Sequence, residues 1–239
     1  MLEEKKSLEI KTVEILFYSF PISFIIGNLF ISIHTLLFIL FSSFLIIKKK
    51  MSYKLTNLHW ILICFFLYLF ILTSIQFLTP GILNEYIHEL SFENNPIFKS
   101  FALIRFFILI FVINIFFINK ILNIKKFFLI SLLCTSFISC DIILQYFSGS
   151  DLFGYESYYE INSGPFGTEY IAGSYLQRFS FFSFFYIFIF FENKKIKNYL
   201  LISIGSLHAI AILLAGNKIP MIMFIIGGGL IFLLIKNTR

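Results

Sequence analysis

The feature that most constrains this chain is a series of long apolar runs that fills almost its whole length. The runs lie at residues 13–29, 31–47, 58–78, 101–118, 127–147, 175–191, 199–215 and 220–235. A helix needs about 20 apolar residues to cross about 30 Å of hydrocarbon. A helix also satisfies its own backbone hydrogen bonds in lipid, and the alternating pattern of a membrane barrel is absent. The sequence predicts an all-α polytopic membrane protein of about eight transmembrane helices.

Composition agrees with this class. Hydrophobic residues make up 59% of the 239 residues, 35 residues are Phe, and only 13% are charged, whereas about 25% are charged in a soluble domain. The three cysteines, Cys64, Cys134 and Cys140, all lie inside apolar runs without metal-ligand spacing. No disulfide framework is indicated. We expect a single transmembrane domain over 1–239, with outer-face loops near 79–100 and 148–174.

The distribution of charge predicts the orientation. The net charge of +6 comes from Lys and Arg that gather in every second connection, around 5–11, 48–54, 120–126, 194–197 and 236–239. The positive-inside rule therefore places both termini in the cytoplasm. These cations are explained as a topology signal, so we expect no nucleic-acid partner. The intervening connections are acidic: they carry Glu85, Glu89, Glu93, Asp151, Glu156, Glu160 and Glu169.

The longest polar stretch, 141–178, is the first candidate for a functional site. Asp141 and Gln145 are four residues apart and so share one helical face. A Ser-Gly-Pro-Phe-Gly turn follows at 163–167, but no Gly-Lys-Ser/Thr follows it as in a P-loop. The carboxylates could bind a divalent metal or act as a general base, yet no Asp-x-Asp pattern or spaced His cluster is present. A solvated acidic loop without metal or cofactor is the expected state.

Basic residues on the outer side are the second candidate. Of 19 Lys and Arg residues, only Lys99, Arg105, Arg178 and Lys218 lie toward the predicted outer face. The last three lie near outer helix ends and could converge on an anion such as a diphosphate, because guanidinium groups bind phosphate oxygens through paired donors. Alternatively, they pair with Glu169, Asp141 or lipid headgroups. The spacing alone leaves both interpretations open.

Several motifs together resemble the bacterial O-antigen ligase and polymerase superfamily of integral membrane glycosyltransferases. They are Pro-Ile-Ser-Phe-Ile-Ile-Gly-Asn-Leu-Phe at 21–30, Asp-x-x-x-Gln-x-x-x-Gly-x-Asp-x-Phe-Gly at 141–154, the 163–178 segment, and Ala-Gly-Asn-Lys-Ile-Pro at 215–220. The resemblance implies residence in the bacterial inner membrane and action at its periplasmic face. It also implies metal-independent, inverting transfer of a glycan from an undecaprenyl diphosphate carrier, with outer-face Arg residues holding the diphosphate.

Carried over by position, Arg178 matches the basic residue that enters the helix after the loop. Lys218 stands where relatives usually have Arg, and Ile161 and Asn162 stand where relatives tend to have one more Arg. Relatives commonly have further spans and a large outer loop with a functional His, which a second chain would have to supply here. The predicted substrate-binding set is Arg105, Asp141, Gln145, Asp151, Glu169, Tyr175, Arg178 and Lys218. The alternatives are a non-enzymatic carrier or transport component for the same lipid-linked glycan, and an inactive fragment.

Overall fold

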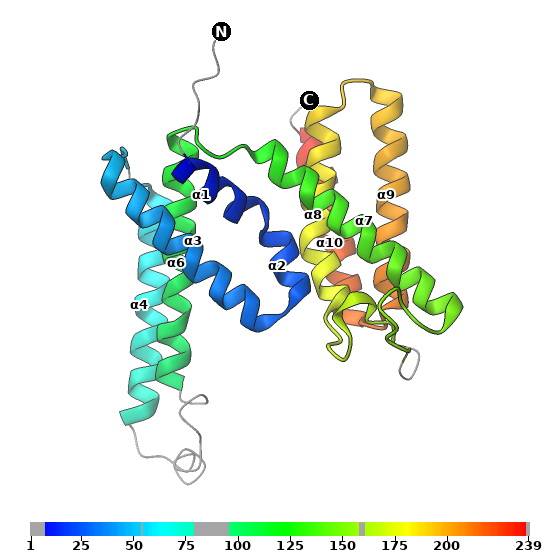
Figure 1. The fold of residues 1–239 in the computed structure, drawn as a ribbon, viewed down its shortest axis with the longest axis horizontal. Coiled ribbons are helices and arrows are strands. Elements are labelled where there is room, and N and C mark those ends of the chain that lie inside the picture. The colour runs from blue at the N-terminus through cyan, green and yellow to red at the C-terminus, as the bar shows by residue number, and fades with distance from the viewer. Residues whose placement is uncertain (1–7, 54, 79–95, 158–160, 238–239) are drawn as a thin grey trace. The chain divides into compact units, whose positions relative to one another are not determined.

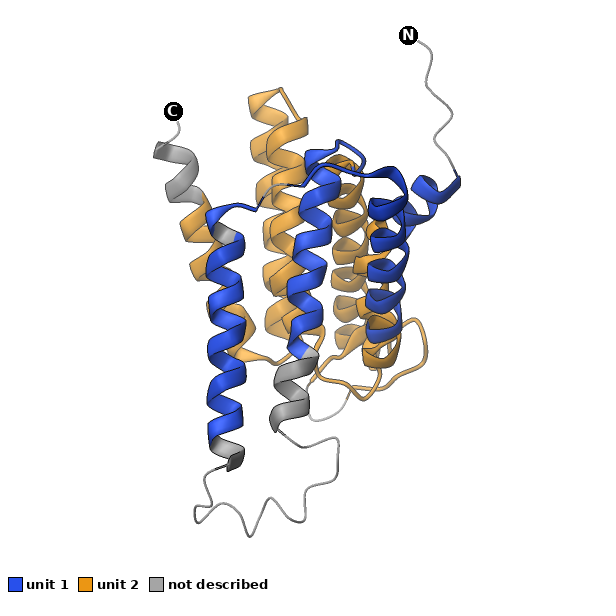
Figure 2. Cartoon of the chain, turned by 90° about the vertical axis from the view of Figure 1, so that its left-hand side faces the viewer, with its two compact units in different colours: residues 1–16, 32–122 blue, residues 17–31, 123–239 orange. Residues whose placement is uncertain are grey.

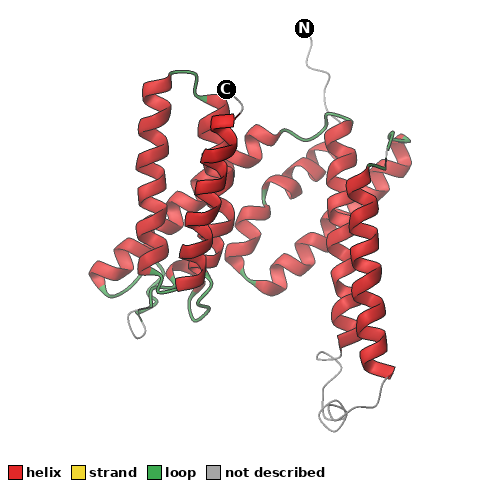
Figure 3. Ribbon diagram, turned by 180° about the vertical axis from the view of Figure 1, so that it is seen from behind, coloured by secondary structure: helices red, strands yellow, loops and turns green. Residues whose placement is uncertain are grey.

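The computed structural model describes residues 8–53, 55–78, 96–157 and 161–237. Their regular secondary structure is helical, and the one β-type contact within them is the isolated bridge between Ser150 and Glu156 (Figure 3). The all-α expectation is confirmed for these residues. The outer-face loop expected near 79–100 lies outside them, except for the start of helix α6.

The chain divides into two compact units, shown in different colours in Figure 2. Unit 1 contains Met1–Leu16 and Ser32–Leu122, and unit 2 contains Phe17–Ile31 and Asn123–Arg239. Each unit therefore combines a short N-terminal piece with a long continuous segment.

Unit 1 is built from most of α1 (Leu8–Tyr18), most of α3 (Asn28–Lys49), α4 (Asn57–Leu78) and α6 (Pro96–Ile118). Helices α4 and α6 pack along each other (Figure 1). The buried His59 ring links them: its Nδ1 accepts from the Thr56 backbone N–H at 3.1 Å, and its Nε2 lies 3.0 Å from the Asn114 side-chain nitrogen. Hydrogen bonds of His59 thus connect α4 and α6 at one end of a helix pair that otherwise packs through apolar side chains.

Unit 2 contains α2 (Phe20–Ile26), α7 (Ile124–Ser148), α8 (Ala172–Phe190), α9 (Lys194–Leu214), α10 (Lys218–Asn237) and the short 3₁₀ helix η2 (Gly164–Phe166). Its core is formed by fully buried apolar side chains of α7, α8 and α9, including Ile138, Leu176 and Ile212. The Thr135 and Ser183 hydroxyls also meet at 2.9 Å between α7 and α8. Small hydroxyl side chains let helix backbones approach closely in a membrane.

The first apolar run, 13–29, does not form one helix. It is divided between α1 and α2 at Ser19, and Gly27, with φ of 129°, separates α2 from α3. Pro21 lies at the start of α2, where its missing backbone N–H costs no helical hydrogen bond. A proline in a helix interior removes a hydrogen bond and kinks or breaks the helix. A break thus replaces the single span over 13–29 that the sequence predicts.

Membrane character is supported by three of the described helices. By length and composition α3, α7 and α9 could each cross a bilayer, and shorter apolar segments lie at His59–Ile75, Leu103–Ile118 and Lys218–Ile231. A membrane protein is therefore indicated. The number of eight spans and the orientation of the termini stay predictions.

Two neighbouring glycines of α10 offer a matched test of packing in unit 2. A Cβ at Gly227 would overlap the ring of Phe181, whereas a Cβ at Gly228 would meet nothing within 4 Å. Phe181 has little room to move because its ring stacks on Phe224 with centroids 6.0 Å apart.

We expect Gly227→Ala to lower the free energy of unfolding by about 1–3 kcal/mol, as overpacking does. Gly228→Ala should not lower it, because alanine favours a helix by about 1 kcal/mol over glycine. Thermal unfolding of the purified protein in detergent measures both variants. Equal midpoints for the two would contradict this packing of α8 against α10.

Candidate functional site

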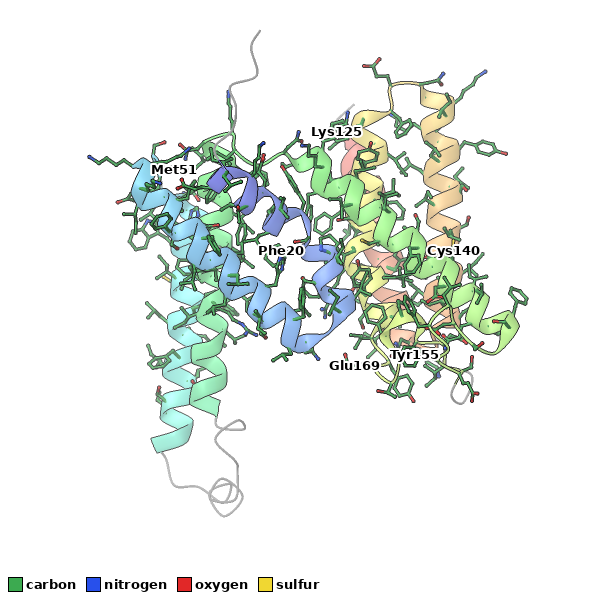
Figure 4. All side chains as sticks on the ribbon, viewed as in Figure 1. Phe20, Met51, Lys125, Cys140, Tyr155 and Glu169 are labelled. Carbon is green, nitrogen blue, oxygen red and sulfur yellow. The ribbon has the colours of Figure 1, made fainter. Side chains whose placement is uncertain are left out.

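The candidate site lies at one end of unit 2. There the last turn of α7, the first turns of α8 and the turn between α9 and α10 come together, and the loop 149–171 connects α7 to α8 (Figure 1). Tyr155 and Glu169 mark this end in Figure 4, and Lys125 marks the opposite end of the unit. We call this the loop end of unit 2.

Two side chains of α7 hold the loop. Gln145 is completely buried; its Nε2 donates to the Tyr155 carbonyl at 3.1 Å, and its Oε1 accepts from the Gly164 N–H at 2.8 Å. Asp141, one turn earlier, accepts from the Leu152 N–H through Oδ1 at 2.9 Å. The predicted shared face of Asp141 and Gln145 is therefore used to bind backbone of the protein's own loop.

The sequence predicts that the carboxylates of this region are solvated, but two of them are buried in the structure. Asp141 is 1% exposed and Asp151 is 6% exposed, whereas Glu156 and Glu169 are exposed. Asp151 is buried because its Oδ1 accepts from the N–H groups of Phe153 and Tyr155, at 3.0 and 2.6 Å. The expectation of a solvated loop is thus wrong for the two aspartates, which stabilise the turn from inside.

The other side of the loop is fixed to the α9–α10 turn. Asn162 donates to the Leu214 carbonyl at 2.7 Å, and Asn217 donates to the Tyr170 carbonyl at 2.9 Å. Gly216, with φ of 76°, allows Ile161 to approach: a Cβ there would lie 3.2 Å from an Ile161 side-chain carbon. The loop therefore joins α7 to the α9–α10 turn.

A pocket of about 580 Å³ opens beside this turn. Arg178, near the start of α8, and Lys218, the first residue of α10, both line it. The remaining lining residues are Ser174, Gln177, Gly216, Asn217, Ile219, Pro220 and Met223. Two cations that the sequence separates by 40 positions thus share one pocket.

The electrostatics of the pocket favour an anion. In the part of the chain that the structure describes, neither Arg178 nor Lys218 has a carboxylate ion-pair partner. Lys218 also begins α10, and the free N–H groups and dipole of a helix N-terminus add positive potential. Among the described side chains, no ion pair joins Glu169 or Asp141 to Arg178 or Lys218, so the alternative that these carboxylates neutralise the two cations is not supported.

Tyr175, Glu169 and Arg105 are not among the described residues that line the pocket. Tyr175 is 4% exposed; its hydroxyl donates to the Pro21 carbonyl at 2.9 Å, and its ring stacks on Phe179. It therefore joins α8 to α2 inside the core. Glu169 is an exposed loop residue. Arg105 belongs to unit 1, where its guanidinium donates to the Ser32 hydroxyl at 3.3 Å and lies 4.9 Å from the Phe106 ring centroid.

Three polar residues of the pocket, Ser174, Gln177 and Asn217, were not predicted. A signal was present for the first two, because Ser174, Gln177 and Arg178 have the i, i+3, i+4 spacing of one helical face. Nothing comparable marks Asn217, which reaches the pocket through the α9–α10 turn. Among the described residues, no group of three or more His, Cys, Asp and Glu side chains is placed to hold a metal ion.

Comparison with family models, with curated proteins and with solved structures found no match. The resemblance to the O-antigen ligase and polymerase superfamily therefore depends on the short motifs alone. The pocket and its two cations are the observations from which a function can be argued.

Proposed function

We propose that this protein binds an undecaprenyl diphosphate-linked glycan at the periplasmic face of the bacterial inner membrane and transfers it, as an O-antigen polymerase or ligase does. The observation that carries the proposal is the shared pocket of Arg178 and Lys218. Two cations without an acidic partner among the described residues suit a ligand with two adjacent negative phosphates.

The chemistry of glycan transfer gives these cations a role. When the glycosidic bond to the carrier breaks, negative charge develops on the leaving diphosphate. Cations held in position lower the barrier if they bind the transition state, with its additional negative charge, more strongly than the ground state. The planar guanidinium of Arg178 can bind two phosphate oxygens at once, and the ammonium of Lys218 acts as a point charge.

The position of the pocket supports the periplasmic side. In unit 2, helices α7 and α9 begin with Lys125, Lys126, Lys194, Lys195 and Lys197. These N-termini lie at the end of the unit opposite the loop end (Figure 4). Because cytoplasmic connections are enriched in Lys and Arg, the pocket falls on the outer side under the positive-inside rule.

A second candidate function, a carrier that binds the lipid-linked glycan without reacting it, is favoured by the pocket's composition. The described residues that line it include no carboxylate and no imidazole. General-base activation of an acceptor hydroxyl requires such a group within about 3 Å or one water. The pocket by itself therefore supplies anion binding, and the base would have to come from outside its lining.

One reconstitution separates these functions. The protein in liposomes is supplied with an undecaprenyl diphosphate-linked oligosaccharide, with and without a lipid A core acceptor, and the glycans are sized by gel and mass spectrometry. Longer lipid-linked chains, or transfer to the core, support the transferase. Saturable binding of an unchanged glycan supports the carrier, and the absence of both contradicts the proposal.

A further inference from the structure

Two buried carboxylates at the loop end of unit 2 each leave one oxygen unused. Asp141 and Asp151 bind backbone N–H groups only through Oδ1. Both Oδ2 atoms are buried and have no hydrogen-bond partner in the described part of the chain. Buried polar atoms are nearly always satisfied in folded proteins, so two such oxygens, one on α7 and one in the loop, need a partner.

The two aspartates also act on each other. They lie close together, because Asp141 Oδ1 accepts from the N–H of Leu152, the residue that follows Asp151. Among the described residues, no Lys, Arg or His forms an ion pair with either aspartate. An uncompensated buried carboxylate is costly, and a second one nearby adds repulsion. A positive ligand between them would remove both costs.

Backbone lies directly against one of the two unused oxygens. Gly164, with φ of 53°, passes Asp141 so closely that a Cβ on it would lie 3.5 Å from Oδ2 and 3.1 Å from an Ile142 side-chain carbon. The absence of a side chain at Gly164 thus lets the loop backbone lie next to this oxygen. The neighbouring groups are hard oxygens, namely the carboxylates, the amide oxygen of Gln145 and loop carbonyls. Oxygen ligands of this kind suit Ca²⁺, which accepts flexible coordination by six to eight oxygens.

We propose that the Oδ2 atoms of Asp141 and Asp151 bind one calcium ion, which fastens the loop to the end of α7. The ion would join Asp141 of α7 to Asp151 of the loop, next to the hydrogen bond that Asp141 accepts from the Leu152 N–H. Only two carboxylates contribute, and no third acidic group joins them in the described chain. The affinity should therefore be on the order of 10⁻⁴ to 10⁻³ M, as in extracellular calcium modules.

Terbium luminescence tests this site on the full chain in detergent. Tb³⁺ replaces Ca²⁺, and the nearby loop residue Tyr155 can sensitise its emission. We expect a saturable signal that Ca²⁺ displaces, and a loss of affinity of about ten-fold or more in both Asp141→Asn and Asp151→Asn, because each removes a charged ligand. The exposed Glu156, in the same loop, provides the control: Glu156→Gln should change the affinity by less than about two-fold.

If an aspartate variant does not fold, a measurement on the wild-type protein still tests the site. Millimolar Ca²⁺ should raise its thermal unfolding midpoint, and EDTA should reverse the rise. A wild-type protein with no saturable Tb³⁺ signal and no Ca²⁺-dependent midpoint would overturn the proposal, as would an equal loss in Glu156→Gln. Stabilisation by mild acid in place of Ca²⁺ would also overturn it, since the pair then holds a proton.

Discussion

Replacing Arg178 by Ala should weaken the binding of undecaprenyl diphosphate by about 10- to 100-fold, because a hydrogen bond to a charged group contributes about 1.5–3 kcal/mol. Lys218→Ala should weaken binding as well, by a smaller factor, since an ammonium makes no paired contacts. The affinity can be measured by quenching of a fluorescent lipid diphosphate on the protein in nanodiscs.

Two further variants make the result specific. Arg178→Lys keeps the charge but loses the bidentate geometry, so its affinity should fall between wild type and Arg178→Ala. Lys197→Ala removes a cation at the opposite end of unit 2, where Lys197 lies over the ring of Phe188. Lys197→Ala should leave the affinity for the lipid diphosphate unchanged. If it lowered the affinity as much as Arg178→Ala, the loss would reflect general surface charge and not the pocket.

Gln145→Leu should be the most damaging single change at the loop end. It keeps the side-chain volume but removes the acceptor of the Gly164 N–H and the donor to the Tyr155 carbonyl. A buried group left without its partner costs about 1–3 kcal/mol, so unfolding should become easier by about 2–4 kcal/mol. Thermal unfolding and the rate of protease cleavage within 149–171 should both report the change.

Gln177→Leu is the matched control for that substitution. Gln177 lines the pocket and is only half-buried. The same chemical change there should lower the unfolding free energy by less than about 0.5 kcal/mol, as is usual for surface substitutions. A Gln145→Leu protein as stable and as protease-resistant as Gln177→Leu would show that the loop is not held by α7.

Helix positions could be predicted well where an apolar run is long and uninterrupted. The run 127–147 lies inside α7, which begins three residues earlier, and the run 199–215 covers most of α9, which begins five residues earlier and ends one residue sooner. The run 13–29 failed because periodicity and hydrophobicity do not register a backbone break. Pro21 and Gly27 act through a missing N–H and a positive φ, and only the folded backbone shows that both take effect.

The site could be predicted in part. The scarcity of cations on the predicted outer side singled out Arg178 and Lys218, and both line one pocket of the structure. The burial of Asp141 could not be predicted, because the polar loop folds back on α7 through contacts between residues ten or more positions apart. Tyr175 belongs to the predicted substrate-binding set, but its hydroxyl donates to the Pro21 carbonyl inside unit 2.

The central claim is that Arg178 and Lys218 together recognise a diphosphate, and a comparison of two lipids tests it most directly. The measurement is the affinity of the wild-type protein and of the Arg178→Ala, Lys218→Ala double variant for undecaprenyl diphosphate and undecaprenyl monophosphate. We expect the wild type to prefer the diphosphate by about ten-fold or more and the double variant to bind both equally weakly. A wild-type protein that binds the two lipids equally, or a double variant that keeps the preference, would contradict the account.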